Sequence, residues 1–408
     1  MNTTVNAGDT AWVLMATALV MIMTPGLAFF YGGLVRKKNI LGILMQSLMA
    51  LSILSVMWVV IGYSLTFSRG NPFIGGLRFV GLGGIGMGPS SYAPHIPALV
   101  FVVFQMMFAV ITPALVAGAF AERMKFGAYI AFIIAWSILV YYPVAHWVWG
   151  HGGWLKSIGT LDFAGGIVVH TTAGFAALIT AIYIGRRKKG EHYPTPHNLP
   201  FTVLGAALLW FGWFGFNAGS ALGANALSAN AFLTTNTAAA AAAIVWAILD
   251  KLTSGKPTIL GTATGAIAGL ATITPASGYV SVGGALAIGA SSALVCYFMV
   301  ATIKPRLHYD DTLDAFGVHG AGGFWGTLMV GVFAVPAING AHGLVAGSAH
   351  QLGVQALAVV AAALYTSIVT YIIVKVIDLV TGIRVSDRDE AIGLDLSEHN
   401  ERAYTLVD

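Results

Sequence analysis

The chain is divided into long apolar runs that short polar loops separate. Windows of about 20 apolar residues, the length with which an α-helix crosses the hydrocarbon core of a bilayer, recur eleven times along its 408 residues. Only 9% of the residues are charged, whereas a soluble domain carries roughly a quarter, so this chain cannot cover a water-facing surface. We therefore predict an all-α polytopic membrane protein with eleven transmembrane helices. They are expected near 11–35, 40–67, 98–121, 126–145, 164–185, 199–218, 231–250, 259–275, 283–303, 314–335 and 351–381.

Basic residues set the expected orientation of these helices. One set of alternate loops holds thirteen Lys and Arg residues and the opposite set holds three. Because cytoplasmic loops carry the excess of Lys and Arg, we predict a cell-membrane protein with its N-terminus outside and its C-terminal tail in the cytoplasm. The cytoplasmic set is Arg36, Lys37, Lys38, Arg123, Lys125, Arg186, Arg187, Lys188, Lys189, Lys251, Lys256, Lys304 and Arg306, and the outer set is Arg69, Arg78 and Lys156.

Two histidines occupy matching places in the apolar runs. His170 lies in the fifth predicted helix and His319 in the tenth, and each follows an aspartate after a polar loop, Asp162 and Asp314 respectively. Eleven helices fit two sets of five inserted in opposite senses, followed by a long eleventh helix. The alternative is a chance similarity between glycine-rich segments. Inverted repeats bring paired functional groups together near the bilayer midplane, where these two histidines would meet.

The two imidazoles must find hydrogen-bond partners if they lie inside a membrane. A single intramembrane histidine is commonly a packing residue bonded to a backbone carbonyl, but polar groups at this depth also mark substrate and proton paths. Together, His170 and His319 offer four ring nitrogens to each other and to a small polar guest. The apolar centres of the other runs hold no acid, which favours a small or transiently neutral cargo.

Aromatic residues gather in three further segments, 104–109, 145–154 and 210–220. An aromatic face near an outer mouth attracts a cation by about 0.5–2 kcal/mol, depending on desolvation. The alternative for any one of these tryptophans is a place in an interfacial aromatic belt. Phenylalanines near the midplane would form a dewetted constriction that rejects hydrated ions. The residues concerned are Phe108, Trp149, Trp213 and Phe216.

Several of these motifs, in this order, resemble the ammonium transporter (Amt/Mep/Rh) family, and the microbial Amt branch most closely. The resemblance runs from about residue 8 to the tail motif at 393–399. It is carried by Phe-Gln-Met-Met-Phe-Ala at 104–109, Ala-His-Trp-Val-Trp-Gly at 145–150, Leu-Asp-Phe-Ala-Gly-Gly-Ile-Val-Val-His at 161–170, Trp-Phe-Gly-Phe-Asn-Ala-Gly-Ser at 213–220 and Phe-Gly-Val-His-Gly at 316–320.

The resemblance implies a role for each matching residue. Phe108, Trp149 and Ser220 would form an outer site that recruits ammonium, or methylammonium as its analogue, and Phe108 and Phe216 would stack as a gate below it. The twin histidines of the pore would be His170 and His319, with Trp213 beside them. Asp162 would cap the start of the fifth helix rather than bind the ion. The family also implies a homotrimer with one pore per subunit, and no cofactor or resident metal.

Two segments lie apart from this pattern. Where many relatives read Trp-Gly-Gly-Gly, this chain has Trp149-Gly150-His151-Gly152; His151 either titrates at the mouth or is a solvated loop residue. We divide the chain into a transmembrane domain, 1–382, and a polar cytoplasmic tail, 383–408. Composition alone allows a disordered tail. The family resemblance instead implies a regulatory tail that docks on the cytoplasmic face of a neighbouring subunit and couples the states of the pores, and the same face would receive a PII-type signal protein.

The expected activity is passage of ammonium through a pore that takes the cargo as neutral ammonia. The sequence leaves open whether the proton follows over His170 and His319, which would make net transport electrogenic. The first rival is an ammonium sensor with little flux, and such sensors usually append a kinase or cyclase domain, which the tail does not contain. A membrane enzyme is the second, but the chain has no His-Glu-x-x-His motif, no nucleophilic serine motif and no paired intramembrane aspartates. A urea or carbon dioxide channel is the third. We expect no enzymatic activity and no nucleic-acid partner.

Overall fold

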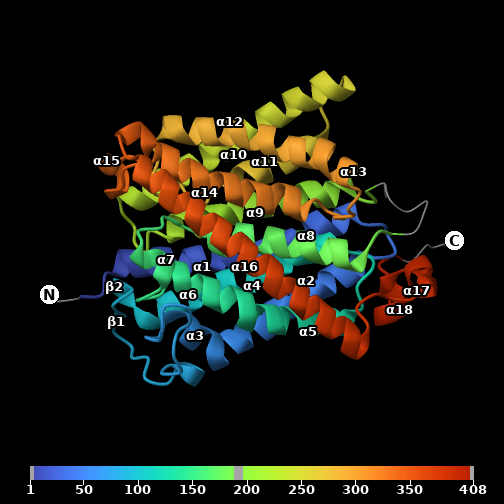
Figure 1. Cartoon of the computed structure of the whole chain (residues 1–408), viewed down its shortest axis with the longest axis horizontal. Coiled ribbons are helices and arrows are strands. Elements are labelled where there is room, and N and C mark those ends of the chain that lie inside the picture. Colours follow the sequence, from blue (N-terminus) through green and yellow to red (C-terminus); the bar gives the residue numbers. More distant parts are fainter. Residues whose placement is uncertain (1–3, 188–195, 405–408) are drawn as a thin grey trace.

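The computed structural model describes residues 4–187 and 196–404, and over this part of the chain it is predominantly helical. Figure 1 shows long helices running side by side, with the N-terminus, β1, β2, α7 and α15 at one end and α13, α17 and α18 at the other. Lys188 and Lys189, used above for the orientation, lie outside the described residues, as do residues 405–408 of the predicted tail.

Nine helical segments of the described residues are long and apolar enough to cross a membrane. Several are continuous rods in which a π-helical turn (η) joins two α-helices. The nine are α1 (Ala7–Leu34); α2, η1 and α3 (Ile40–Met57, Trp58–Gly62, Tyr63–Phe67); α4 (Ala98–Phe120); α5, η3 and α6 (Phe126–Trp136, Ser137–Tyr141, Tyr142–Trp149) with α7 (Trp154–Ser157); η4 and α8 (Gly166–Thr171, Thr172–Ile184); α9 (Leu199–Gly219); α10 (Ala226–Ser254); α12, η5 and α13 (Val282–Phe298, Met299–Ile303, Lys304–Leu307); and α16 (Ala349–Thr381).

Two shorter helical segments occupy the places of the eighth and tenth predicted helices. They are α11 (Ile259–Ile273), and η6 with α14 (Phe316–Gly320, Ala321–Phe333). Each of the eleven predicted windows therefore coincides with a helical segment, and α16, the last, runs obliquely across the others (Figure 1). The remaining elements are η2 (Val80–Leu82), β1 (Pro89–Ser90) paired antiparallel with β2 (Ala93–Pro97), α15 (Pro336–Asn339), η7 (Leu344–Ala346), α17 (Asp387–Ile392) and α18 (Leu394–His399).

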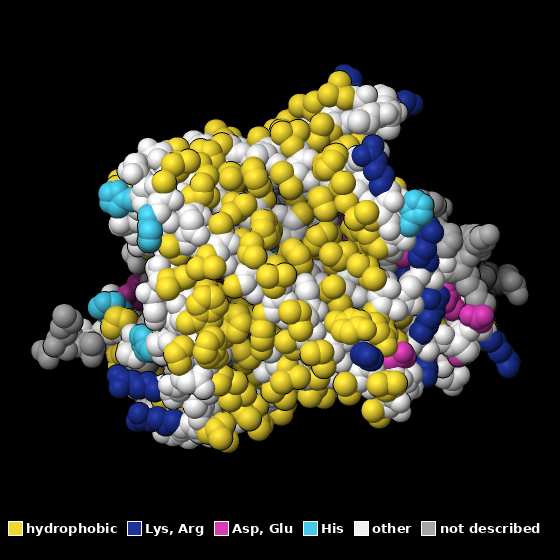
Figure 2. All heavy atoms as spheres, viewed as in Figure 1, with side chains coloured by type: hydrophobic (Ala, Val, Ile, Leu, Met, Phe, Trp, Pro, Cys, Tyr) yellow, Lys and Arg dark blue, Asp and Glu magenta, His cyan; other side chains and the backbone are white. Residues whose placement is uncertain are grey.

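The surface has the distribution expected of a protein surrounded by lipid. Figure 2 shows hydrophobic side chains covering the middle of the molecule, while Lys and Arg side chains gather at the two ends. Large aliphatic residues point outward from the long helices; Leu48, Ile244 and Leu364 are 58%, 62% and 59% exposed. In water such a surface would aggregate, whereas against lipid tails it costs nothing.

Small residues let the helices approach closely. Helices α1 and α9 pack against each other, and a Cβ built on Gly205 would lie 2.1 Å from the backbone nitrogen of Phe30. A Cβ on Gly33 would lie 2.3 Å from Oγ1 of Thr202. In lipid, where helices gain no hydrophobic energy by associating, this close backbone approach supplies van der Waals contact.

The tail packs on the same chain and supplies the caps of two long helices. Asp395 Oδ1 accepts from the backbone N–H of Gly42 at 2.9 Å, and Glu398 Oε2 accepts from the N–H of Phe126 at 2.8 Å. Neither α2 nor α5 has a side-chain cap from its own N-cap residue. Because the first N–H groups of a helix lack internal partners, these two carboxylates tie the tail to the helix ends.

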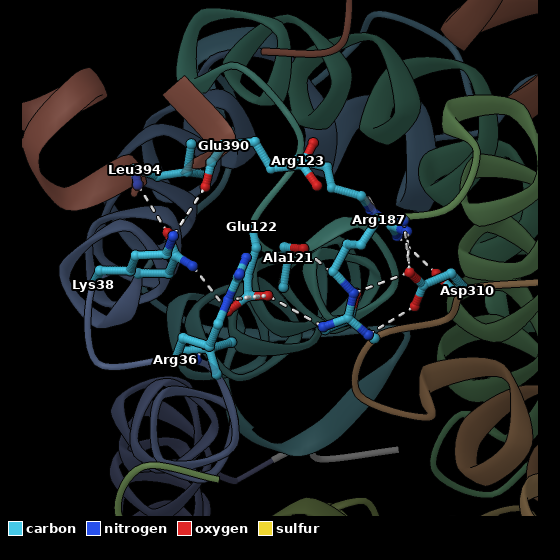
Figure 3. A network of polar contacts seen from close by, with 12 residues as sticks. Arg36, Lys38, Ala121, Glu122, Arg123, Arg187, Asp310, Glu390 and Leu394 are labelled. Atoms are coloured by element: carbon cyan, nitrogen blue, oxygen red, sulfur yellow. Dashed lines mark hydrogen bonds and ion pairs between the residues drawn. The ribbon is translucent and has the colours of Figure 1, made fainter. Parts of the chain in front are cut away.

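A buried network of charges holds the loops together beneath the tail. Glu122 accepts from Arg36 at 3.1 Å and from Arg187 at 3.1 Å, and Arg187 also donates to Asp310 at 2.8 Å. Arg123 pairs with the same aspartate at 3.0 Å. Figure 3 shows Arg187 between Glu122 and Asp310. Paired and hydrogen-bonded in this way, the charges tolerate burial that would be prohibitive for any one of them alone.

Candidate functional site

Asp162 shapes the start of the first histidine-bearing segment. Its carboxylate accepts four backbone N–H groups, those of residues 165, 166, 167 and 168, at 2.8, 2.6, 2.8 and 3.1 Å. Gly165, at φ +117°, permits the turn into η4. Burial raises the pKa of Asp162 to about 6, against the N–H donors, which favour the carboxylate. His170 follows eight residues after this aspartate, inside the π-helical turn.

The second histidine-bearing segment has the same construction, but its capping residue is Asp311. This carboxylate accepts from the N–H groups of Ala315 at 3.1 Å and Phe316 at 2.7 Å. Asp314, which the sequence comparison paired with Asp162, instead binds Lys304 Nζ at 2.6 Å. That pairing was wrong. Asp311 lies eight residues before His319, the same spacing as Asp162 has to His170. The distance to the histidine therefore indicates the equivalent aspartate, whereas the similar residues around Asp162 and Asp314 do not.

The two segments pack against each other reciprocally through glycines. A Cβ on Gly174 would lie 2.0 Å from the backbone nitrogen of Gly320, the residue after His319. A Cβ on Gly323 would lie 2.7 Å from Cβ of His170. Each glycine is four residues beyond the histidine of its own segment and contacts the histidine turn of the other. This relation brings the two imidazoles together.

The imidazole rings of His170 and His319 lie side by side and are buried. Their centroids are 5.3 Å apart with an interplanar angle of 15°, and the side chains belong to residues that are 1% and 3% exposed. Trp213 stacks on His170 at 5.4 Å and is itself fixed by a 2.8 Å hydrogen bond from its Nε1 to Thr274 Oγ1.

Three ring nitrogens of this pair have no partner among the described residues. They are Nδ1 and Nε2 of His170 and Nδ1 of His319. A buried polar atom without a hydrogen bond costs about 1–3 kcal/mol, so a fold that keeps three of them at one place leaves room for a polar guest to supply the bonds.

A column of aromatic rings leads from the histidines toward the end that holds β1, β2 and α7. Phe216 lies 6.0 Å from His170 and 4.2 Å from Phe108, both centroid to centroid, and Trp149 meets Phe108 edge-on at 6.0 Å. Phe108 and Phe216 are fully buried, whereas Trp149 is half-buried. Ser220 also stands half-buried at this end, and its Oγ donates to the carbonyl of Phe216 at 2.8 Å, which leaves its lone pairs to accept a bond.

The cavity at the histidines is narrow. The volume that the centre of a water-sized guest can occupy is ≈ 10 Å³, which is enough for about one small molecule. Its lining includes His170, His319, Trp213 and Phe216. His319 also lines a wider cavity of ≈ 300 Å³ toward the opposite end, beside Lys304 and Asp314. The predicted residues thus lie in one line: Trp149 and Ser220, the tilted pair Phe108 and Phe216, the paired histidines, and the wider cavity at the opposite end.

Sequence reasoning missed several residues of this arrangement. Asp311, Thr274, Gly174 and Gly323 were not singled out, since their partners are distant in the sequence. His151 lies outside the line of rings; it is exposed and stacks on Tyr92 at 4.0 Å. Over the described residues, no group of three His, Cys, Asp or Glu side chains is arranged to hold a metal ion.

The fold and the site together define a class: a polytopic helical membrane protein with a narrow cavity that two buried histidines and aromatic rings line. The sequence profile of the Ammonium Transporter Family matches residues 11–404. The chain is 49% identical to the ammonium transporter of Bacillus subtilis (strain 168) over 97% of this chain and 98% of that protein. It belongs to the ammonium transporter family.

Solved structures agree with this assignment. The crystal structure of Candida albicans Mep2 matches with a TM-score of 0.90 at 38% identity, over 98% of this chain and 91% of that chain. A structure described as a "Sensor Amt Protein" matches with a TM-score of 0.89 at 31% identity, over 96% and 98% of the two chains.

Proposed function

We propose that this protein transports ammonium by binding the ion at an outer aromatic site, removing its proton near Phe108 and Phe216, and conducting neutral ammonia along the histidines. The proton either returns to the outer water, which makes transport neutral, or passes over the imidazoles of His170 and His319, which makes it electrogenic and gives a current. The observation that carries the proposal is the set of unpartnered imidazole nitrogens of His170 and His319 in a cavity with room for one water-sized guest. Ammonia has both donors and an acceptor with which to satisfy them.

The outer site rewards what distinguishes ammonium from potassium. The two ions are similar in size and charge, but ammonium carries four directional N–H donors. The rings of Trp149 and Phe108 would attract the cation, and Ser220 Oγ would accept one N–H bond. This recruitment role for the three residues rests on their common position at the outer end of the ring column.

The gate and pore exploit the second difference, which is that ammonium can lose a proton. Phe108 and Phe216 would close the passage to hydrated ions. An ion that enters must lose its bound water, and apolar side chains offer no polar contacts to replace that hydration. Potassium cannot lose its charge, so it would have to bear the whole free energy of dehydration. Ammonium escapes it by crossing as ammonia.

At the level of the whole protein, we propose eleven crossings in an inverted five-plus-five arrangement with α16 as the eleventh, in the cell membrane. The reciprocal contacts of Gly174 and Gly323 and the eight-residue spacing of Asp162 and Asp311 support the repeat. The charge asymmetry supports an outer N-terminus and a cytoplasmic regulatory tail, 383–408. We further propose a homotrimer and a PII-type partner on the cytoplasmic face, as the family resemblance implies.

The alternative is a sensor that binds ammonium with little flux. The similarity to the "Sensor Amt Protein" structure supports it, because a chain 31% identical to this one shares the fold. The two functions differ in turnover, not in the site.

Currents from purified protein in proteoliposomes test the proposal. An ammonium pulse should evoke a current or an internal pH change, and an equal potassium pulse should not. Replacing His170 by Ala separates the roles of the histidines: loss of ammonium-selective current supports a path along the rings. An undiminished, selective current in His170→Ala would remove the histidines from the mechanism, and binding without turnover would favour the sensor.

A further inference from the structure

A second cavity opens at the outer end, beside the ring column but separate from it. It measures ≈ 980 Å³ and lies between the loop that follows α3 and the turn after α6. Three of its lining residues are basic, namely Arg69, Arg78 and His151, and none of the described lining residues is acidic. A basic hollow next to the entrance of a cation pathway is unexpected, because its field repels the cargo.

The charges of this cavity are not neutralised by the protein. Arg69 and Arg78 are exposed, and neither guanidinium has an ion-pair partner among the described residues. The acids of the predicted outer loops are engaged elsewhere: Asp9 accepts from the N–H of Ala224, and Asp162 caps η4. Lys156 adds a further charge, with its Nζ 5.7 Å from the ring centroid of Tyr92, a wall of the cavity.

The wall between the cavity and the ring column is well ordered by hydrogen bonds. The rings of His151 and Tyr92 stack at 4.0 Å and 19°, and Ser91 Oγ lies 3.1 Å from Nε2 of His151. Tyr92 Oη accepts from the backbone N–H of His151 and donates to the carbonyl of Phe67. On the far side, Lys156 Nζ donates to the carbonyl of Trp149 at 2.9 Å. The cavity and the outer aromatic residues therefore share one set of contacts.

We propose that this cavity binds a phosphate-type oxyanion. Guanidinium groups present paired N–H donors that match two oxygens of such an anion, and the serine, tyrosine and imidazole groups can complete its coordination. Binding cancels the positive potential beside Trp149 and so strengthens recruitment of ammonium. This second consequence rests on the function proposed above, whereas binding itself does not.

Two sources supply this chemistry, inorganic phosphate in solution and the phosphate of a lipid headgroup. The same loop exposes Phe73, Leu77 and Met87 by 59%, 65% and 80%, so it presents apolar side chains where a lipid headgroup would be met. The two sources are separated by experiment.

Binding is measured first, by isothermal titration of inorganic phosphate into the whole protein in neutral detergent at constant ionic strength. The matched variants are Arg69→Gln/Arg78→Gln and Arg306→Gln, which alters an exposed arginine of α13 at the opposite end. We expect saturable binding by the wild type and Arg306→Gln, and binding at least about tenfold weaker in the double variant. Melting temperatures of all three establish that they are folded.

The lipid arm repeats the comparison in nanodiscs of phosphatidylcholine with and without phosphatidylglycerol. If the lipid is the source, phosphatidylglycerol raises the melting temperature of the wild type and Arg306→Gln but not of the double variant. The absence of both responses in the wild type overturns the proposal, as does an equal response in the double variant.

Transport supplies the last readout. In phosphatidylcholine proteoliposomes, exchanging external chloride for phosphate should lower the KM for methylammonium in the wild type and leave it unchanged in Arg69→Gln/Arg78→Gln. An unchanged KM in a wild type that binds phosphate overturns the coupling. Phosphate binding by a protein that transports nothing would leave the anion site standing and refute the proposed function.

Discussion

Replacing Gly174 by Ala should separate the two histidine-bearing segments. The new Cβ would lie 2.0 Å from N and 2.1 Å from Cα of Gly320, whereas ordinary contacts fall at 3.4–4 Å. Both opposing atoms belong to the backbone, so no side chain can turn aside to make room. The segments must move apart, and the imidazole rings, now 5.3 Å apart, must move with them.

The magnitude follows from two opposing terms. Overpacking a tight contact costs about 1–3 kcal/mol. Alanine in a helix is favoured over glycine by about 1 kcal/mol, which offsets part of that cost. Gly174→Ala is therefore expected to lower the free energy of unfolding by up to about 2 kcal/mol. Transport per folded molecule should also fall, because the geometry of the pore changes.

Gly127→Ala is the matched control, since no atom lies within 4 Å of a Cβ built at that position of α5. It should keep or slightly raise the melting temperature and leave methylammonium uptake intact. Gly323→Ala should reproduce the Gly174→Ala defect, because its Cβ meets Cβ of His170 at 2.7 Å. Thermal melting in detergent and uptake into proteoliposomes measure both quantities. Wild-type melting and uptake in Gly174→Ala would show that this contact does not set the pore.

Three further outcomes follow from the capping and charge contacts. Asp162→Asn leaves one acceptor oxygen for four N–H groups and should destabilise the protein by about 1–3 kcal/mol in thermal melting; an unchanged melting temperature contradicts the capping role. Burial alone would raise the pKa of Asp310, but Arg187 and Arg123 hold it at about 2, so its contribution of about 2 kcal/mol is present above pH 4 and lost as the pH falls toward 2. The melting temperature of Asp310→Asn should therefore lie below that of the wild type by a constant interval from pH 7 to pH 5, and the interval should narrow in more acidic buffer. Glu398→Gln weakens the cap of α5 by about 1 kcal/mol and should speed amide exchange in the tail, which unaltered exchange would disprove.

The sequence determined the membrane class and the helical segments. Crossing lipid requires a run of about 20 apolar residues, so composition along the chain is itself the signal. Each predicted window coincides with a helical segment, although α11 and the η6–α14 segment are shorter or more polar than a typical span. The aromatic and histidine motifs also stand out locally, because polar or bulky residues are rare in such runs.

Only the tertiary structure decided which residues meet. Asp311 rather than Asp314 caps η6 because of where the chain turns before this segment. The residues next to the two aspartates in the sequence do not indicate the position of that turn. The ring column joins residues of four separate helices, and the caps of α2 and α5 come from the tail, more than 250 positions away in the chain. Insertion into lipid depends on the composition of each segment by itself, so the sequence predicts it. Contacts between residues of different segments form only after the segments have packed, so they are seen only in the tertiary structure.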